Sequence, residues 1–514
     1  MALPGRDAVI AALRDATVIG IAPRQIALKT KLSREAVNDE LDTLRDEGRI
    51  ARIGRNLWVL SQYEDITKMP GFTTPKWYAN EFHKHFGVSL RKYIGRITFN
   101  ENGGKKVHRW SPYIQGFSAS FVEVMLDRYK IRSEMRIADP FVGSGTVSVC
   151  AKLRGIDSVG VEVIPLMAFM ARVKTEWDYD ISTVKSETAS VLKVAQEEAP
   201  DDFELPFLTR TKEQFDPPIL TNLLKLRWAI NEGVMSATIK NLLRLAFVSI
   251  LVDCSKLWRA PCLAYTEKHL AKDEPFNSFQ AKVTDMIEDL RYVQKYRQRW
   301  GDIQIVERDA REYTYEQNSL DLAITSPPYM NGIDYVLNYK IEMAWLGLAR
   351  SYEDLRTLRK KMIACDNLSR VTIKRFAESE WRVHDKWLDD IVDVMGDNLA
   401  RKTIARRTDM HLVVRKYFED MLPVIQNIHE GLRHGGHFIL VVGDSLISGV
   451  YVPTDMILAR IAKKVGFSVE GIQVARQRRS GQRRDFLLRE SIVTLVKDKS
   501  PSIATSPGGL NHFF

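Results

Sequence analysis

Two consecutive prolines directly after an apolar run are the feature that most constrains how this 514-residue chain folds. The run Leu320–Ile324 predicts a buried strand, and Thr325–Tyr329 (T-S-P-P-Y) follows it. Because proline has no N–H to donate and holds φ near about −65°, Pro327 and Pro328 end the sheet ladder and fix the nearby carbonyls. A hydroxyl before this rigid turn and an aromatic ring after it suit the binding of a flat ring that carries an amine. A plain turn at the end of a strand would leave the same pattern.

A glycine-rich turn lies upstream, between a short strand and a helix-like run. It reads D-P-F-V-G-S-G-T over Asp139–Thr146 and follows Met135–Ala138. Glycines at such a turn let the backbone approach a ligand, Thr146 is placed to cap the helix, and the free N–H groups of the helix start face the ligand. The next strand, Ser158–Val163, ends near Glu162, the usual position of a carboxylate that binds ribose hydroxyls. Each turn alone is weak evidence, but together with Glu162 they predict one ligand site.

The remaining strands define the fold class. Ile303–Asp309, His437–Asp444, Phe467–Ala475 and Ser491–Val496 join the three strands named above and make seven. They alternate with helices early in the chain and follow one another directly near its end. This order predicts an α/β fold, with a mostly parallel, doubly wound, Rossmann-like sheet and an antiparallel pair at its end. Ligands of such sheets bind beyond the carboxyl ends of the strands, where both turns fall.

With these motifs the chain resembles the amino-group DNA methyltransferases, which use S-adenosyl-L-methionine to methylate the exocyclic amine of cytosine or adenine. Asp139–Thr146 matches the cofactor loop of that family at its fixed positions, and Thr325–Tyr329 matches its catalytic loop. Trp110–Phe121 is a looser match to the family motif that packs on the methionine end of the cofactor. The resemblance covers roughly the catalytic core, and its two main motifs are specific.

The resemblance implies roles for individual residues. Catalysis falls to Ser326, Pro327, Pro328 and Tyr329. Cofactor binding falls to the two loops, two strand ends and one preceding aromatic residue, namely Phe117, Asp139, Pro140, Phe141, Gly143, Ser144, Gly145, Thr146, Glu162, Asp309 and Thr325.

The residue before the prolines bears on which base is methylated. Family members with serine there are typically cytosine-N4 enzymes, whereas aspartate or asparagine is typical of adenine-N6 enzymes. Ser326 therefore predicts methylation of cytosine N4 in duplex DNA, with the target base flipped out of the helix. Adenine-N6 methylation and RNA amino-group methylation stay as alternatives, and a non-catalytic DNA-binding regulator is a third.

The chain divides into an appendage, a core and two insertions. Residues 1–61 predict a winged helix, with Ser33 capping its third helix and Gly48 ending it. That helix exposes acidic as well as basic residues, so contact with DNA and contact with protein stay as equal alternatives. The further divisions are a linker at 62–107, the cofactor-binding half of the core at 108–169, a helical insertion at 170–300, the catalytic half at 301–347, a basic helical insertion at 348–415 and the C-terminal part of the core at 416–514.

The charge of the chain favours a polyanionic partner. Seventy-five Lys and Arg residues against 65 Asp and Glu residues give a net charge of +10. We expect double-stranded DNA to contact the insertion at 348–415, which also contains Trp381 and Trp387 as planar groups for bases, and the loop Arg476–Arg484. Charge runs are also typical of solvated surfaces. The candidate phosphate contacts are Lys374, Arg375, Arg406, Arg407, Arg476, Arg478, Arg479, Arg483 and Arg484.

The four cysteines contain no C-x-x-C pair, which predicts neither a disulfide framework nor a metal site, and Cys262 is interpreted as a packing residue. No signal-peptide pattern opens the chain, and its longest apolar stretch is too short to span a bilayer. A cytoplasmic protein without membrane contact is therefore expected. The resemblance allows a companion restriction endonuclease as a partner, and the oligomeric state stays open.

Overall fold

A central sheet organises the molecule. The computed structural model describes residues 4–16, 21–53, 57–60, 75–95, 97–114, 116–200, 202–259, 263–330, 332–400, 407–479 and 487–498. In this part of the chain the sheet has eight strands in the order β3-β13-β14-β10-β9-β4-β5-β8. They are β3 (Leu90–Lys92), β4 (Arg136–Asp139), β5 (Asp157–Glu162), β8 (Ile303–Glu307), β9 (Leu320–Thr325), β10 (Leu432–Gly443), β13 (Phe467–Arg479) and β14 (Leu487–Lys497).

The sheet is mostly parallel, as the sequence predicts, but the prediction of seven strands is wrong. Only β14 runs antiparallel to both of its neighbours. The eighth strand, β3, lies in the segment predicted as a linker, which also forms helix α4 (Pro75–Phe86). Its pairing with β13 is parallel and joins Leu90 to Ile472. Three residues at a sheet edge with two exposed basic side chains have no apolar alternation to reveal a strand.

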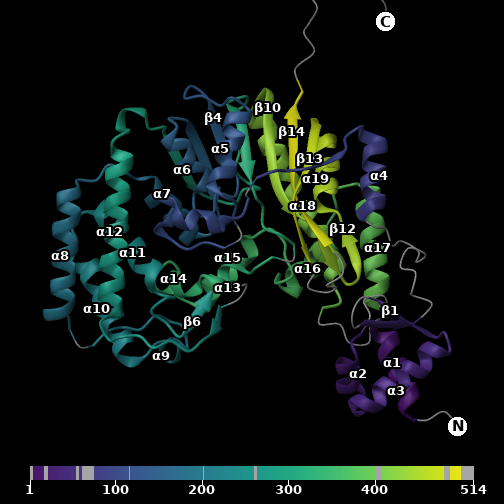
Figure 1. Cartoon of the computed structure of the whole chain (residues 1–514). Coiled ribbons are helices and arrows are strands. Elements are labelled where there is room, and N and C mark those ends of the chain that lie inside the picture. Colours follow the sequence, from purple (N-terminus) through teal and green to yellow (C-terminus); the bar gives the residue numbers. More distant parts are fainter. Residues whose placement is uncertain are drawn as a thin grey trace, which may run out of the picture.

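Both faces of the sheet are apolar, because successive residues of a strand point to opposite sides. Leu440 and Val442 of β10 belong to the cluster that contains α18 (Met410–Gly431) and α19 (Thr454–Val465). Ile439 and Val441 of the same strand belong to the cluster that contains α5 (Ala119–Arg128) and α6 (Thr146–Leu153). Figure 1 shows helices on both sides of the sheet. The strand order reverses where β4 and β9 lie side by side, and this is the ligand-binding point of such folds.

The first insertion is a helical body that packs against α7 (Pro165–Thr175) at one end of the molecule (Figure 1). The prediction that it is helical throughout is wrong in one place, because Leu257–Arg259 (β6) and Leu263–Tyr265 (β7) form a hairpin. Cys262 lies outside the described residues. The helices are α8 (Ile181–Glu197), α9 (Thr211–Gln214), α10 (Pro217–Gly233), α11 (Ala237–Ile250) and α12 (Glu274–Gln294).

The second insertion follows β9 and is helical in the described residues. Its Trp387 is buried and packs against Tyr78 at a ring distance of 5.1 Å, with the Arg460 guanidinium 4.3 Å from the ring centre. The interpretation of Trp387 as a planar group for DNA bases is therefore wrong. Its helices are α15 (Tyr352–Lys361), α16 (Arg370–Ala377) and α17 (Lys386–Ala400). Helices α13 (Tyr335–Asn338) and α14 (Lys340–Trp345) precede the insertion and lie in the segment 301–347.

The N-terminal residues form a separate small body beyond α17 (Figure 1). It contains α1 (Pro4–Ala16), α2 (Pro23–Thr30), α3 (Arg34–Asp46) and an antiparallel pair of β1 (Ile50–Ile53) and β2 (Leu57–Leu60). Ser33 caps α3 as expected by accepting from the Ala36 N–H at 3.1 Å, and Gly48 follows the helix with φ +68°. Arg45 of α3 is paired with Asp42 and Asp46, so this helix offers little net positive charge. Its assignment as a winged helix stays a prediction.

Candidate active site

The two motifs singled out in the sequence meet at the carboxyl ends of β4 and β9. Thr325, the last residue of β9, donates its hydroxyl to a carboxylate oxygen of Asp139 at 2.6 Å. Asp139 also accepts the Phe141 N–H at 3.0 Å. Burial raises the pKa of Asp139 to about 7, although both hydrogen bonds favour its charged form. One buried carboxylate thus joins the start of the glycine loop to the start of the Ser-Pro-Pro-Tyr turn.

The glycine loop needs its glycines for two different reasons. Gly143 has φ +50° and Gly145 has φ +88°, a region that L side chains rarely adopt. A Cβ on Gly143 would lie 2.6 Å from the Tyr113 hydroxyl, and one on Gly145 would lie 3.1 Å from the Ala171 backbone. Gly145, not Thr146, is the N-cap of α6, so the expectation that Thr146 caps the helix is wrong. Thr146 is the first residue of the helix.

Glu162 ends β5 and holds the loop in place. One carboxylate oxygen accepts the Gly143 N–H at 3.0 Å, and the other accepts the Ile164 N–H at 2.9 Å. Burial raises the pKa of Glu162 to about 7 despite these two donors. Since each carboxylate oxygen has a further lone pair, Glu162 keeps acceptor capacity toward the cavity that it borders.

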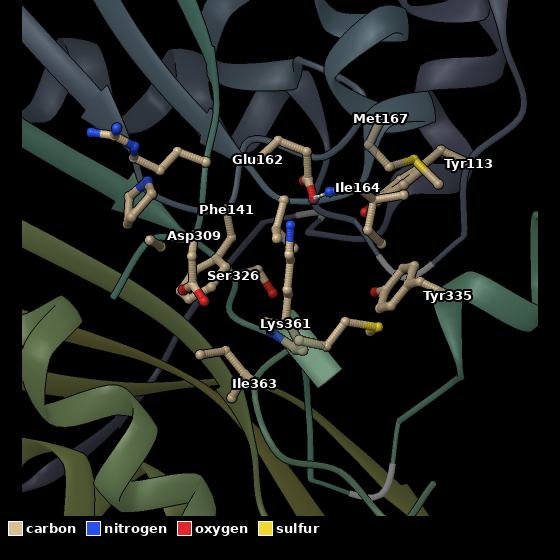
Figure 2. Close-up of a pocket in the computed structure, with 16 residues that line it drawn as sticks. Tyr113, Phe141, Glu162, Ile164, Met167, Asp309, Ser326, Tyr335, Lys361 and Ile363 are labelled. Carbon is tan, nitrogen blue, oxygen red and sulfur yellow. Dashed lines mark hydrogen bonds between the residues drawn. The ribbon is translucent and has the colours of Figure 1, made fainter. Parts of the chain in front are cut away.

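A cavity lies in front of these groups. Figure 2 shows Glu162 between Phe141 and Ile164, with Asp309 on one side and Tyr113, Met167 and Tyr335 on the other. Among the residues predicted to bind the cofactor or to act in catalysis, six line this cavity, namely Pro140, Phe141, Glu162, Asp309, Ser326 and Pro328.

Asp309 is already held by protein groups. Its carboxylate accepts from the Arg311 side chain at 2.6 Å and from the Arg311 N–H at 2.9 Å, and Arg311 also binds Asp420 at 2.9 Å. The pair is only partly exposed, and it fixes the Asp309 carboxylate at the wall of the cavity.

A second cavity lies on the other side of Ser326. It is lined by Ser326, Tyr329, Phe117 and charged residues of the last two strands, among them Arg478. The Tyr329 hydroxyl donates to Glu490 at 2.8 Å, and Arg476 is paired with the same carboxylate. Burial, and next the Glu490 carboxylate, raise the pKa of Tyr329 well above its ordinary value. Tyr329 is therefore a neutral donor, and its hydrogen bond to Glu490 anchors the hydroxyl end of the ring.

The structure brings most of the predicted site residues together, with two differences. Phe117, expected on the cofactor side, lines the second cavity, and Tyr113 from the same segment lines the first. Ser144, Gly145 and Thr146 form the loop behind the first cavity and do not line it. Pro327 is buried and lines neither cavity, and Thr325 is fully buried.

The predicted phosphate contacts fall into four groups. Arg476 and Arg478 line the second cavity, where Arg476 is paired with Glu490 and Arg478 donates to the Asp444 carbonyl. Lys374, Arg375 and Arg479 are exposed. Arg407 donates to Asp409 and to the carbonyls of Asp366 and Leu368, so it stabilises its own loop. Arg406, Arg483 and Arg484 lie outside the described residues.

The sequence argument missed several residues of the two cavities, and four of them are instructive. Lys361, Met362 and Ile363 come from the first part of the basic insertion, where α15 ends, and line the first cavity, which no local pattern reveals. Glu490 does have a signal, because it and Arg489 are charged residues directly before the apolar part of a strand. Among the described residues no cluster of His, Cys, Asp and Glu is placed to hold a metal ion. In the same residues no helix is long and apolar enough to cross a membrane.

The residues of the first cavity fit an adenosine-containing cofactor. Glu162 offers acceptors for ribose hydroxyls, and Phe141, Ile164 and Ile363 offer apolar faces. The strand order and these residues suit S-adenosyl-L-methionine as the cofactor, and the relatives described next are methyltransferases.

Three known proteins similar in sequence are Type II methyltransferases. M.BsoBI of Geobacillus stearothermophilus is 23% identical over 428 residues, which cover 74% of this chain and 83% of the relative. M.AvaI of Anabaena variabilis is 25% identical over 408 residues, which cover 74% of this chain and 82% of the relative. M.MjaII of Methanocaldococcus jannaschii is 36% identical over 174 residues, which cover 33% of this chain and 32% of the relative.

No protein-family model matches the sequence. Among solved structures, a TehB-like SAM-dependent methyltransferase from Corynebacterium glutamicum is 9% identical, with a TM-score of 0.21 over 74% of this chain and 99% of that chain. A likeness at that level carries no argument about function.

Proposed function

We propose that this protein is a site-specific DNA methyltransferase that transfers a methyl group from S-adenosyl-L-methionine to the N4 amine of cytosine in duplex DNA. The observation that carries the proposal is that Ser326 lines both cavities. The first cavity has groups suited to a nucleoside cofactor, and the second has an aromatic ring and hydrogen-bonding groups suited to a base. The similarity to Type II methyltransferases supports DNA as the substrate.

The residues around Ser326 are placed to make the amine of the base a better nucleophile. The lone pair of an amine on a base is delocalised into the ring, which makes that amine a poor nucleophile. The bound cofactor supplies a methyl group that its positive sulfur already activates. Ser326 Oγ and the carbonyls fixed by Pro327 and Pro328 accept the amine N–H groups, which turns the lone pair toward the methyl group. Transfer forms a carbon–nitrogen bond and breaks a carbon–sulfur bond, and the amine then loses one proton.

The second cavity provides the surroundings for a flipped base. Extrusion of a base from the duplex costs a few kcal/mol, and stacking on an aromatic face offsets part of that cost. Tyr329 provides the face, and its bond to Glu490 fixes the ring plane. Phe117 lines the same cavity.

The remaining parts of the chain take supporting roles in this proposal. The exposed Lys374 and Arg375 at the end of α16 make the second insertion our candidate for target recognition. The N-terminal body is assigned as a winged helix on its three helices and strand pair. Because its α3 is electrostatically paired within itself, we do not assign base reading to it.

Transfer of a labelled methyl group tests the proposed function. Purified protein is incubated with labelled cofactor and duplex DNA, and the DNA is digested to nucleosides for mass spectrometry. We expect N4-methylcytosine. N6-methyladenine alone would support the adenine alternative, and label in tRNA but not in DNA would support an RNA substrate. No transfer to any of these substrates would contradict the enzyme assignment.

A further inference from the structure

Arg478 is the charged residue of the second cavity that the proposed chemistry does not yet use. Its Nη2 atom donates to the Asp444 carbonyl at 3.1 Å. Its Nε atom is buried and has no hydrogen-bond partner among the described residues. The Arg478 side chain is half-buried. Because a buried donor without an acceptor is costly, a ligand in the second cavity can supply the acceptor that the described protein groups do not. Arg476 differs, because its guanidinium is already paired with Glu490.

The backbone places the Arg478 guanidinium beside the ring that stacks the base. Arg476 and Arg478 line the second cavity together, whereas the neighbouring Arg479 is exposed and does not line it. A Cβ on Gly443 would lie 3.0 Å from Tyr329 Cε2 and 3.4 Å from Arg478 Nη2. Gly443 therefore lets the tyrosine ring and the guanidinium approach the same point of β10.

The two candidate bases differ in what they offer such a group. Arginine carries only donors, arranged as a planar fork. On its Watson–Crick edge cytosine presents the N4 amine and two acceptors, N3 and O2, whereas adenine presents the N6 amine and one acceptor, N1. Flipped bases are commonly read on this edge.

We propose that Arg478 is the specificity-determining residue of the site, donating to N3 and O2 of cytosine while Ser326 accepts from its N4 amine. This inference rests on the proposed function. An adenine bound by its amine at Ser326 would leave guanidinium donors unpaired in a buried site, and this asymmetry selects against it. Cytosine specificity then comes from two residues that line the same cavity, not from Ser326 alone.

The test combines a change in the enzyme with a change in the base. Sequencing of DNA methylated by the wild-type protein defines a target duplex, which is then made with cytosine or with 3-deazacytosine, in which a C–H replaces N3. We expect 3-deazacytosine to lower the wild-type kcat/KM by about 10- to 100-fold, as for loss of a good bidentate contact. Arg478→Met should lower kcat/KM for cytosine by a similar factor and lose nearly all discrimination against 3-deazacytosine. Arg479→Met, the matched exposed control, should keep that discrimination.

Each outcome decides something. Wild-type activity that is indifferent to 3-deazacytosine overturns the role of Arg478 whatever the variants do, and so does discrimination that persists in Arg478→Met. If Arg478→Met does not fold, Arg478→Lys keeps the charge but not the fork and should show the same loss of discrimination. If the wild-type product is not N4-methylcytosine, the proposed function fails instead, which the nucleoside analysis reveals before any variant is made.

Discussion

Among the described residues, Ser326 is the one that lines both cavities. In the proposed function its hydroxyl accepts a hydrogen bond from the amine. We expect Ser326→Ala to lower kcat by about 100- to 1,000-fold, the usual effect of removing one hydrogen-bonding group that acts in a transition state. The cofactor Kd should change little, because Glu162 and the glycine loop remain. Single-turnover methylation and equilibrium dialysis measure the two quantities. Ser379→Ala, an exposed serine whose hydroxyl donates to Phe376, should leave both unchanged, and a matching loss there would contradict the role given to Ser326.

Glu162 makes cofactor binding depend on pH. Its pKa in the folded protein is raised to about 7 by burial. Ribose hydroxyls are better bound by the carboxylate than by the neutral acid, so cofactor affinity should rise as the pH increases toward about 7 and level off above it. Glu162→Gln should bind more weakly at pH 8 and lose this pH-dependent component. Isothermal titration calorimetry from pH 5.5 to 8.5 provides the comparison, and an unchanged pH profile in the variant would exclude Glu162 as the source.

The same ionisation of Glu162 should make the folded protein less stable as the pH rises, whereas it makes cofactor binding stronger. Because the folded pKa of Glu162 lies above that of the unfolded chain, the folded state binds more protons, and its stability falls as the pH rises from about 4.5 to about 7. Glu162→Gln cannot ionise, so without cofactor it should gain about 2 kcal/mol relative to the wild type between pH 5 and pH 8. Urea unfolding at the two pH values measures this difference. A constant difference would mean that Glu162 titrates normally.

At the scale of elements, a buried charge network joins β10, β14 and α19 behind the second cavity. Arg489 binds Asp444 and Asp455, each at 3.0 Å, and Ser491 donates to Asp455 at 2.7 Å. Both aspartates are fully buried, and the pKa of Asp444 is raised by burial and by Asp455. Arg489 does not line the second cavity. The network therefore acts indirectly, by fixing Asp444 and the backbone next to Glu490.

Removal of the arginine from this network should destabilise the fold more than removal of a surface arginine. We expect Arg489→Met to cost about 3–5 kcal/mol, because two buried carboxylates lose their cation. The loss should be larger at pH 8 than at pH 6, since protonation relieves unpaired carboxylates. Arg433→Met removes an exposed partner of Asp321 and should cost about 0.5 kcal/mol or less. Urea unfolding of both variants tests this, and equal losses would contradict a structural role for the network.

Some elements could be predicted from the sequence and others could not. The turns after β4 and β9 could be predicted because glycine and proline impose their own backbone restrictions, so the motif contains its geometry. Strand β3 could not, because its pairing with β13 depends on a partner that lies far along the chain. The same holds for Lys361, Met362 and Ile363, which reach the first cavity only after an insertion has folded back. Phe117 lines the second cavity and not the first, because its position follows from tertiary packing, which the local sequence does not contain.

At the scale of the whole molecule, only part of the positive charge behind the net charge of +10 is available to bind DNA. Arg45, Arg311, Arg407 and Arg489 are committed to carboxylates or carbonyls of the protein itself. Exposed cations such as Lys374 and Arg375 are the ones left to meet phosphates, and they lie on the insertion that also contributes Lys361, Met362 and Ile363 to the first cavity. The charge that matters for DNA is therefore the exposed part, not the total.

Binding of DNA should accordingly weaken with salt in a way that depends on α16. Each phosphate contact contributes about 0.9 to the slope of log K against log salt. The double variant Lys374→Gln/Arg375→Gln should reduce that slope by about 2 while leaving kcat at saturating DNA unchanged, because α16 holds neither Ser326 nor the cofactor loop. Fluorescence anisotropy of a labelled duplex between 50 and 200 mM salt, on the order of the physiological range, gives the slope. The control Lys185→Gln/Lys193→Gln removes two exposed cations from α8 in the first insertion. If the α8 variant lowers the slope and the α16 variant does not, the first insertion, and not the second, contacts the DNA backbone.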